Sequence, residues 1–229
     1  MDEVLLIDKP KDWTSFDVVA KVRGELRRIT GNKKVKVGHA GTLDPMATGL
    51  LIVLTGNMTK QQDDFMKKDK VYEAEITLGA VSDTDDAEGK IVESKVEGIS
   101  SKVEIEDALK SFVGDIEQMP PQYSAIKING QKAYDIARKG QTADLKLRKV
   151  TIYSIENVEV DGLKVRFRCH VSSGTYIRSL ARDLGEKLCC GGYLSALRRT
   201  KIGDYSVSKA HAISDINLDF FQKTVATTE

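Results

Sequence analysis

Two dipeptides, Asn129-Gly130 and Asp161-Gly162, place the strongest constraint on the fold of this 229-residue chain. Both are turn formers, and Asn-Gly favours the tight two-residue turn of a β-hairpin. Asp161-Gly162 separates two apolar-rich stretches, 147–160 and 163–172, which we predict to pair as antiparallel strands. Helical and extended stretches elsewhere mix without the regular alternation that a parallel sheet requires. We therefore predict an α+β fold with a mixed, mostly antiparallel central sheet flanked by helices.

The hydrophobic pattern predicts the remaining elements. Thr14 or Ser15 is placed to cap a first helix that Gly31 ends, and Asn57 to cap a second. The segment 71–78 alternates, with Tyr72 on its apolar side. We expect strands at 4–8, 49–55 and 71–78, extended chain at 123–128 and 194–207, a long loop at 32–48, and helices at 16–30, 57–68, 104–112, 133–139, 175–188 and 215–223.

The composition excludes several classes of protein. No stretch of about 18 apolar residues exists, so no membrane-spanning helix is expected. The first residues, MDEVLLIDKP, are acidic and lack the basic start of a secretory signal. The three cysteines, Cys169, Cys189 and Cys190, are an odd number and lack the spacing of a zinc site. We expect a cytoplasmic protein with reduced thiols that are buried as small side chains.

The net charge of +1 hides a separation of charges along the chain. Between Lys21 and Lys36 there are seven basic side chains and a single acid, Glu25, and acids dominate from Asp83 to Asp107. Further basic clusters are Lys146–Arg148–Lys149 and Arg198–Arg199–Lys201. Such clusters suit a polyanion, but a solvated helix face explains a charge run equally well. Charge alone leaves both interpretations open.

The search for a chemical site leads to GHAGTLDPMATG at residues 38–49. The motifs of phosphate-binding loops, dinucleotide folds, zinc proteases and serine hydrolases are absent. Asp44 precedes Pro45, which restricts the backbone angles of Asp44. The loop glycines allow another segment of the chain to approach the loop backbone closely. An ionised, well-positioned aspartate can act as a nucleophile. On this loop alone, however, the simpler role of Asp44 as the first residue of a turn is favoured.

The loop and four further stretches resemble the TruB family of tRNA pseudouridine synthases, bacterial type, in the same order along the chain. The catalytic loop continues into LLIVLTGNMTK. The other stretches are DKPKDWTSFDVVAKVR, KVYEAEITLGAVSDTDDAEG, PPQYSAIKINGQKAYDIARKG, and SSGTYIRSLARDLGEKL with LRRTKIGDYSV. The resemblance covers about residues 6–207 and implies the pseudouridine synthase fold. It further implies one catalytic domain over residues 1–229, with an inserted RNA-clamping segment at about 121–149 that carries Lys127, Lys132, Arg138 and Lys139.

The resemblance also implies an activity and its catalytic residues. The family isomerises uridine to pseudouridine in RNA without a cofactor or metal, and the implied target is position 55 in the T-loop of tRNA. Asp44 matches the nucleophile, Arg178 the arginine that pairs with it, and Tyr72 the tyrosine that stacks on the base. By pattern alone, Arg178 is a helix-surface residue and Tyr72 a core residue. The target nucleotide is expected to flip out of its stack before it reacts.

Six further residues match family positions that bind the substrate. They are His39 at the edge of the loop, Tyr176 and Leu197 in the base pocket, Asp86 in the acidic loop, and Lys9 and Lys60 near phosphates. Without the resemblance, Tyr176 and Leu197 are core positions, His39 is a loop residue and Asp86 belongs to a solvated loop. The implied partner is the tRNA T-arm, bound by a monomer that needs no guide RNA or membrane.

Two departures from the family pattern bear on this interpretation. Asp12 stands where relatives often have glycine, but aspartate tolerates left-handed backbone. Only 22 residues follow Val207, so we expect no C-terminal PUA domain and weaker binding of the acceptor stem. One alternative is a guide-RNA-dependent synthase, but Met46-Ala47 after the Asp-Pro favours the stand-alone bacterial type. Another is an RNA-folding protein, and a secondary role of that kind is compatible with catalysis.

Overall fold

The computed structural model describes residues 1–94, 101–128 and 130–221. The chain forms two compact units, one from residues 1–72 and 198–229, the other from residues 73–197. Each unit is described by itself. No helix in the described ranges is both long and apolar enough to cross a membrane.

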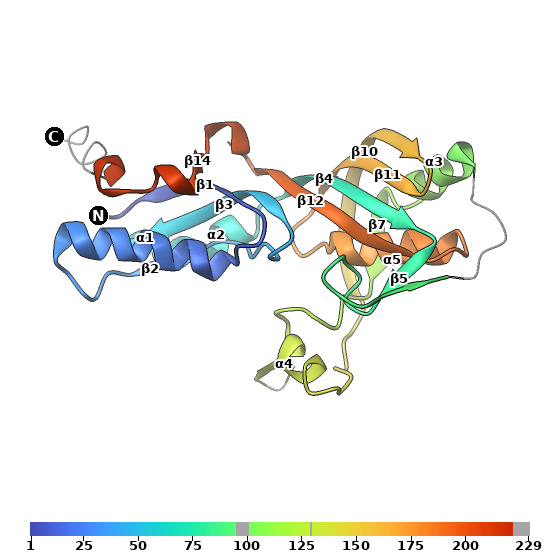
Figure 1. Ribbon diagram of the computed structural model, residues 1–229, viewed down its shortest axis with the longest axis horizontal. Coiled ribbons are helices and arrows are strands. Elements are labelled where there is room, and N and C mark those ends of the chain that lie inside the picture. The colour runs from blue at the N-terminus through green and yellow to red at the C-terminus, as the bar shows by residue number, and fades with distance from the viewer. Residues whose placement is uncertain (95–100, 129, 222–229) are drawn as a thin grey trace. The chain divides into compact units, whose positions relative to one another are not determined.

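A mixed sheet is the main structural element (Figure 1). Its strand order is β14-β1-β3-β12-β4-β11-β10-β7, with β2 beside β3 and β13 beside β12. β1 pairs with β14 and β3 with β12 in parallel, while β2, β7, β10, β11 and β13 form antiparallel pairs. The predicted α+β class with a mixed, mostly antiparallel sheet is confirmed. The strands are Val4–Lys9 (β1), Val37–His39 (β2), Thr48–Thr55 (β3), Lys70–Leu78 (β4), Gly114–Gln118 (β7), Arg148–Asp161 (β10), Lys164–Val171 (β11), Gly192–Ile202 (β12), Tyr205–Ser206 (β13) and His211–Ala212 (β14).

The helix α1 (Ser15–Thr30) covers one face of the first unit's strands. Thr14 caps it in a reciprocal capping box with Asp17, and Gly31 ends it in the left-handed conformation, as predicted. Its apolar stripe packs against residues of β1 and β3. Burial of each such side chain contributes about 1.5–3 kcal/mol. The residues of this core include Val18, Val22, Leu26, Leu5, Ile7, Leu51 and Val53.

Strand β3 is buried on both faces, which explains its unbroken apolar sequence. The side chains that point away from α1 form a second core cluster with Phe65 and Ile202. These side chains are those of Leu50, Ile52 and Leu54. The strand that follows the Asp44 loop is thus one of the most firmly packed parts of the unit.

Two expectations for the first unit are wrong. The short strand β2 interrupts the predicted loop at 32–48. The predicted helix at 57–68 is a 3₁₀ segment, Gly56–Gln61 (η1), followed by α2 (Gln62–Met66). Asn57 does not cap it, because its side chain donates instead to Asp2 at 2.8 Å. That partner lies 55 residues away in the sequence, so local pattern gives no sign of it.

The second unit confirms the hairpin at Asp161-Gly162. β10 and β11 pair antiparallel up to Asp161 and Lys164 on either side of the turn. The predicted helices are present as α3 (Lys102–Lys110) and α5 (Ile177–Lys187). A second hairpin that the sequence did not predict pairs β5 (Ala80–Ser82) with β6 (Ile91–Glu93) and encloses the acidic loop.

The segment 121–149 projects from the body of the second unit (Figure 1). It contains the hairpin of β8 (Lys127–Ile128) and β9 (Gln131–Lys132), as the Asn-Gly signal predicts, although Asn129 lies outside the described residues. The short helix α4 (Ala133–Ala137) follows, also as predicted. The extended stretch expected at 123–128 is a strand over its last two residues alone.

The chain after β12 has little regular structure. Short 3₁₀ segments, Val207–Lys209 (η2) and Ile213–Asp215 (η3), flank β14. The helix expected at 215–223 is observed over residues 218–221, and its last two residues lie outside the described part. The expectation of three buried thiols is wrong for Cys189, which is exposed while Cys169 and Cys190 are buried. Cys189 has a φ of 54°, in the left-handed region, just after α5 ends.

Candidate active site

Asp44 is the first residue of a turn and is half-buried. The N–H of Ala47 donates to the Asp44 carbonyl at 3.1 Å, with Pro45 and Met46 at the centre of the turn. The simple interpretation of this loop as a turn is therefore confirmed. A fixed backbone at Asp44 is also what a catalytic carboxylate needs, because its side chain then starts from a defined position.

The turn is held from the side of β1 and α1. Lys9 is fully buried, and its Nζ donates to the carbonyls of Pro45 (3.2 Å), Pro10 (2.9 Å) and Trp13 (2.6 Å). Ser15 Oγ accepts from the Leu43 N–H at 2.8 Å and donates to the Leu43 carbonyl at 3.0 Å. A buried ammonium bound to three carbonyls holds the backbone segments that carry those carbonyls in place. Lys9 therefore positions the turn, and this burial argues against the phosphate contact expected for it.

Arg199 holds the other side of the same loop. It is 1% exposed, and its guanidinium donates to the carbonyls of Gly41 (2.9 Å), Thr42 (3.3 Å) and Leu50 (2.8 Å). Gly49 pairs with Arg199 in the sheet, and a Cβ at Gly49 would lie 2.3 Å from the Arg199 carbonyl oxygen. The close approach expected of the loop glycines thus holds at Gly49, whereas a Cβ at Gly38 would meet nothing within 4 Å.

Arg199 is a residue that sequence reasoning missed. Its sequence, Arg198-Arg199-Thr200-Lys201, suggested a basic cluster on the surface, either for a polyanion or as a solvated face. That expectation is wrong for Arg199, which is buried, and Arg198 pairs with Asp8 at 2.7 Å. No pattern in the sequence distinguishes the buried Arg199 from its half-buried neighbour Arg198.

The three other predicted residues of the first unit, Tyr72, His39 and Lys60, differ from one another in burial. Tyr72 is 8% exposed on the buried side of β4, as the alternation predicts. His39 ends β2, and burial, with a smaller effect from Arg199, lowers its pKa. Its Nδ1 is buried and has no hydrogen-bond partner among the described residues. Lys60 is exposed on η1.

Arg178 is the centre of a buried network in the second unit. It is 6% exposed, and its Nη1 lies 3.4 Å from Oδ2 of Asp86, which is 1% exposed. The guanidinium also donates to the carbonyls of Thr84 (3.3 Å) and Tyr123 (2.9 Å). Asp86 in turn accepts from the Thr84 hydroxyl at 2.6 Å. The acidic loop is therefore not a solvated charge run at this point, and Arg178 is not on the helix surface.

A second ion pair repeats this arrangement one turn further along α5. Arg182 Nη1 donates to Asp85 at 3.0 Å, and its Nη2 donates to the Met119 carbonyl at 2.9 Å. Burial raises the pKa of Asp85, an effect that the positive charges of Arg182 and Arg178 oppose. Together the two arginines connect α5 to the acidic loop and to the start of segment 121–149.

Tyr176 is placed by a residue that the sequence did not indicate. Gln118, 2% exposed at the end of β7, accepts from the Tyr176 N–H at 2.8 Å and donates to its carbonyl at 3.1 Å. This pair of bonds fixes the backbone at the start of α5, two residues before Arg178. Leu197 is half-buried on β12.

The structure thus gathers the predicted residues into two groups. Asp44, Tyr72, His39, Lys9 and Lys60 belong to the first unit. Asp86, Tyr176, Arg178 and Leu197 belong to the second. Because Asp44 and Arg178 belong to different units, their pairing stays a prediction.

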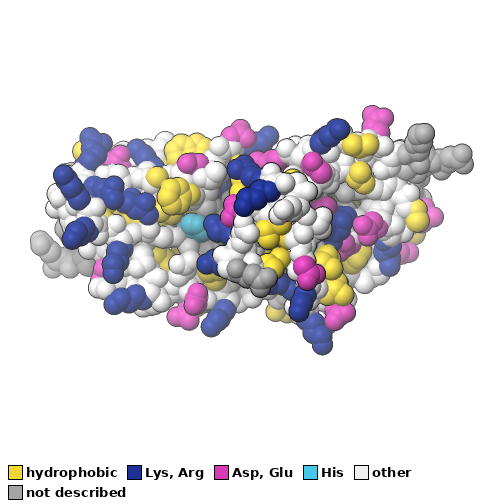
Figure 2. Space-filling model, turned by 90° about the horizontal axis from the view of Figure 1, so that it is seen from below, with side chains coloured by type: hydrophobic (Ala, Val, Ile, Leu, Met, Phe, Trp, Pro, Cys, Tyr) yellow, Lys and Arg dark blue, Asp and Glu magenta, His cyan; other side chains and the backbone are white. Residues whose placement is uncertain are grey.

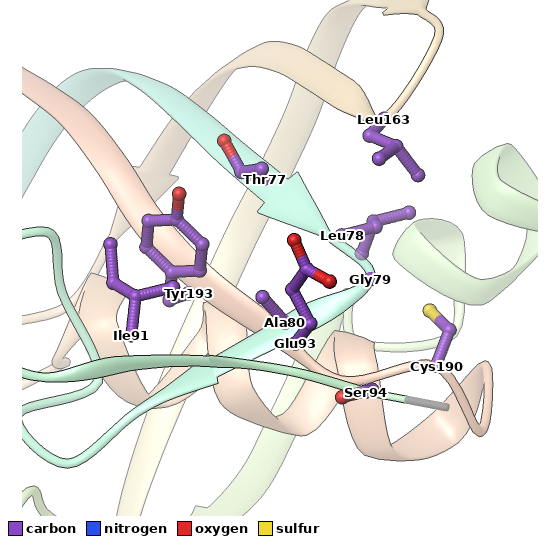
Figure 3. Close-up of a pocket in the computed structure, with 10 residues that line it drawn as sticks. All are labelled: Thr77, Leu78, Gly79, Ala80, Ile91, Glu93, Ser94, Leu163, Cys190 and Tyr193. Carbon is purple, nitrogen blue, oxygen red and sulfur yellow. The ribbon is translucent and has the colours of Figure 1, made fainter. Parts of the chain in front are cut away.

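A pocket of about 520 Å³ in the second unit involves none of these residues (Figure 3). Its lining is mostly apolar, with the Glu93 carboxylate and the Tyr193 ring pointing into it and the Cys190 thiol at its edge. It is separate from the predicted chemistry. Among the residues that the structure describes, no group of three or more His, Cys, Asp or Glu side chains is placed to hold a metal ion.

Comparison with known families gives the chain's membership. A family model described as TruB family pseudouridylate synthase (N terminal domain) matches residues 27–177. A second, described as tRNA pseudouridylate synthase B C-terminal domain, matches residues 178–228. The chain belongs to the TruB family of pseudouridine synthases. Members of this family are isomerases, so the chain is an enzyme and the resemblance read from its motifs is confirmed.

Curated TruB relatives match nearly the whole chain. One, named tRNA pseudouridine synthase B, from Thermobifida fusca is 44% identical over 96% of this chain and 75% of its own length. Another of the same name, from Parabacteroides distasonis, is 43% identical over 99% of this chain and 96% of its own length. The second of these is therefore a relative of almost the same extent.

Solved structures agree on the pseudouridine synthase fold. The chain aligns with TM-score 0.70 and 30% identity to a chain of a Cbf5-Nop10-Gar1 complex, over 97% of this chain and 56% of that one. It aligns with TM-score 0.67 and 28% identity to an archaeal box H/ACA sRNP Nop10-Cbf5 complex, over 96% and 53%. This TruB-family chain spans little more than half the length of those solved chains.

Proposed function

We propose that this chain isomerises a uridine of tRNA to pseudouridine and that Asp44 is its nucleophile. The observation that carries the proposal is the turn at Asp44, which Lys9, Ser15 and Arg199 hold by independent contacts. The buried Lys9 and Arg199 donate to backbone carbonyls on either side of Asp44 in the sequence and so fix its position. Family membership supplies the reaction for which this aspartate is held.

The reaction conserves every atom except one exchanged proton. The bond from N1 of uracil to C1′ of ribose breaks, the base turns within the site, and a bond forms from C5 to C1′. The proton on C5 leaves to solvent, and N1 gains a proton. Asp44 takes part as a carboxylate, whether it attacks the ribose, attacks the base or assists a glycal path.

Arg178 and Tyr72 have complementary roles in this proposal. Arg178 is a fixed positive charge that keeps the reacting carboxylate ionised, since a nearby cation favours the charged form. Tyr72 offers a ring backed by core residues, on which a uracil can stack. Asp86 is a positioning residue, because it acts through Arg178. His39, Tyr176 and Leu197 would line the pocket that receives the flipped nucleotide.

The proposed target is the uridine at position 55 in the T-loop. Segment 121–149 carries seven exposed cations, and four of them, Lys127, Lys132, Arg138 and Lys139, lie on its hairpin and around α4. It projects from its unit and is tied to α5 through Tyr123, and the residue Met119 just before it also contacts α5. RNA hairpins are recognised through shape, phosphates and splayed loop bases, which suits a projecting basic segment.

The experiment uses a tRNA transcript with tritium at C5 of its uridines and the purified protein alone. We expect one tritium to be released for each tRNA, because pseudouridine formation removes the C5 hydrogen. A transcript with cytidine at position 55 is the matched control and should release none. Release that required a guide RNA would favour the alternative suggested by the complexes of the solved neighbours. Equal release from the control would contradict the assignment of the target.

A further inference from the structure

An exposed stripe on α1 combines an aromatic ring with positive charge. Phe16, Ala20, Arg23 and Arg27 recur at spacings of four, three and four, so they lie on one side of the helix. Phe16 is 64% exposed, an unusual position for a phenylalanine. The stripe from Phe16 to Arg27 is about 16 Å long, at 1.5 Å per residue. We refer to these four residues as the α1 stripe.

The exposed Phe16 ring and the arginine beside it suit a nucleobase. The Arg23 guanidinium carbon lies 5.9 Å from the centre of the Phe16 ring. An exposed aromatic ring next to arginine is a platform on which unpaired bases stack. Core packing does not explain Phe16, since the buried side of α1 is formed by Val18, Val22 and Leu26.

Positive charge continues beyond the helix. Lys33, Lys34 and Lys36 are exposed in the loop that follows α1. The one acid among these cations, Glu25, is buried and already pairs with Lys21 (2.9 Å) and Arg28 (3.2 Å). In Figure 2 lysine and arginine side chains gather at the left of the view, over the first unit. The stripe and its loop are therefore a surface for a polyanion.

The α1 stripe is anchored to the segment that carries Asp44. Ser15, the neighbour of Phe16, holds both backbone groups of Leu43, and Asp44 is the next residue. Further along the stripe, Arg23 donates to the Val37 carbonyl of β2 at 2.9 Å. Both contacts lie within the first unit. A strand of RNA with its reacting nucleotide at Asp44 would thus have this surface beside it.

We propose that the α1 stripe, with Lys33, Lys34 and Lys36, binds the RNA strand next to the modified uridine. Phe16 stacks on an unpaired base, and the arginines and lysines contact phosphates. This inference rests on the proposed function, since it extends the same substrate over a second surface. An acidic protein would need only the positive charges of this surface. The exposed Phe16 ring favours RNA, because an unpaired base can stack on it.

The first test removes charge. The variant Arg27→Ala/Lys33→Ala/Lys34→Ala is compared with Lys90→Ala/Lys102→Ala/Lys110→Ala, which loses the same charge from exposed sites of the second unit. Affinity for a T-arm hairpin and for whole tRNA is measured over a range of salt concentrations. The stripe variant should reduce the magnitude of the slope of log K against log salt by about 2. This figure follows from the loss of three cations, at about 0.7–0.9 for each phosphate contact. Equal slopes for the two variants would overturn the proposal.

The second test removes the ring. Phe16→Ala should raise KM for tRNA about tenfold and leave kcat unchanged, because one stacked base is lost. Phe16→Tyr should restore KM, since it keeps the ring. An unchanged KM in Phe16→Ala would also overturn the proposal. These outcomes are distinct from failure of the proposed function, in which the unaltered protein would release no tritium while the salt slopes still reported RNA contact.

Discussion

Arg178 Nη1 and Asp86 Oδ2 lie 3.4 Å apart, and both side chains are almost completely buried. The carbonyls of Thr84 and Tyr123 accept from the same guanidinium. A planar cation bound on several sides has a fixed orientation. The acidic loop and the base of segment 121–149 therefore determine where Arg178 points.

Asp86→Asn should reduce both stability and activity. The substitution leaves the buried Arg178 without its counter-charge, and loss of one partner of a buried pair costs about 3 kcal/mol. Urea unfolding measures the first effect and tritium release the second. Asp83→Asn, at an exposed position of the same loop, is the control and should change neither. Full activity in Asp86→Asn would show that Arg178 needs no help from this carboxylate.

Arg199→Lys should loosen the loop that carries Asp44. Three different nitrogens of Arg199 donate to the three carbonyls, and the single ammonium of a lysine does not reproduce that spread of donors. With one or two buried carbonyls unsatisfied, we expect unfolding free energy to fall by about 3 kcal/mol. Arg198→Lys next to it alters a partly exposed ion pair with Asp8 and should cost under about 1 kcal/mol. Similar losses in the two variants would argue against the loop-anchoring role.

Asp12 should be replaceable by glycine but not by alanine. Its φ is 65°, so the left-handed backbone expected at this departure from the family is present. Its N–H also donates to the Pro45 carbonyl at 2.9 Å. Left-handed geometry costs alanine about 1 kcal/mol, whereas glycine adopts it freely. Urea unfolding of the two variants measures this difference, and equal stability would show that the φ angle is not constrained.

Lys70 should make stability depend on pH in the alkaline range. Burial, with a smaller effect from Arg199, lowers its pKa to about 8, although Asp69 opposes the shift. Its Nζ donates to the Met66 carbonyl at 2.6 Å. Between this pKa and the ordinary value of 10.5, the unfolded chain binds more protons, so unfolding free energy rises with pH.

The expected rise from Lys70 is about 2 kcal/mol between pH 8 and pH 10. Urea unfolding at several pH values measures it. Lys70→Met removes the titrating group, so its stability should increase less over the same range, and subtraction of the two curves isolates Lys70 from other groups. Parallel curves for the two proteins would show that Lys70 does not titrate in this window.

The sequence was informative where local physics decides the outcome. Thr14 and Gly31 define the ends of α1 because capping acts within a few residues. The alternation at 71–78 placed Tyr72 on the buried side of β4 for the same reason. The turn at Asp44 was also readable, since Pro45 acts on its immediate neighbour.

The sequence failed where partners come from distant positions. Gln118 and Tyr176 are 58 residues apart, and Arg199 meets Gly41 across 158 residues. β2 is three residues long and has no alternation to reveal it. The roles of Asp44, Tyr72 and Arg178 came from resemblance to a family rather than from the pattern, because a catalytic aspartate and a turn aspartate have the same local sequence.

The most direct test of the central claim is tritium release by Asp44→Asn from tRNA labelled at C5 of uridine. The substitution keeps the size and the backbone of the turn but removes the carboxylate charge. We predict no release above background from a variant that still folds and binds tRNA with unchanged affinity. Release at the rate of the unaltered protein would contradict the claim that Asp44 is the nucleophile.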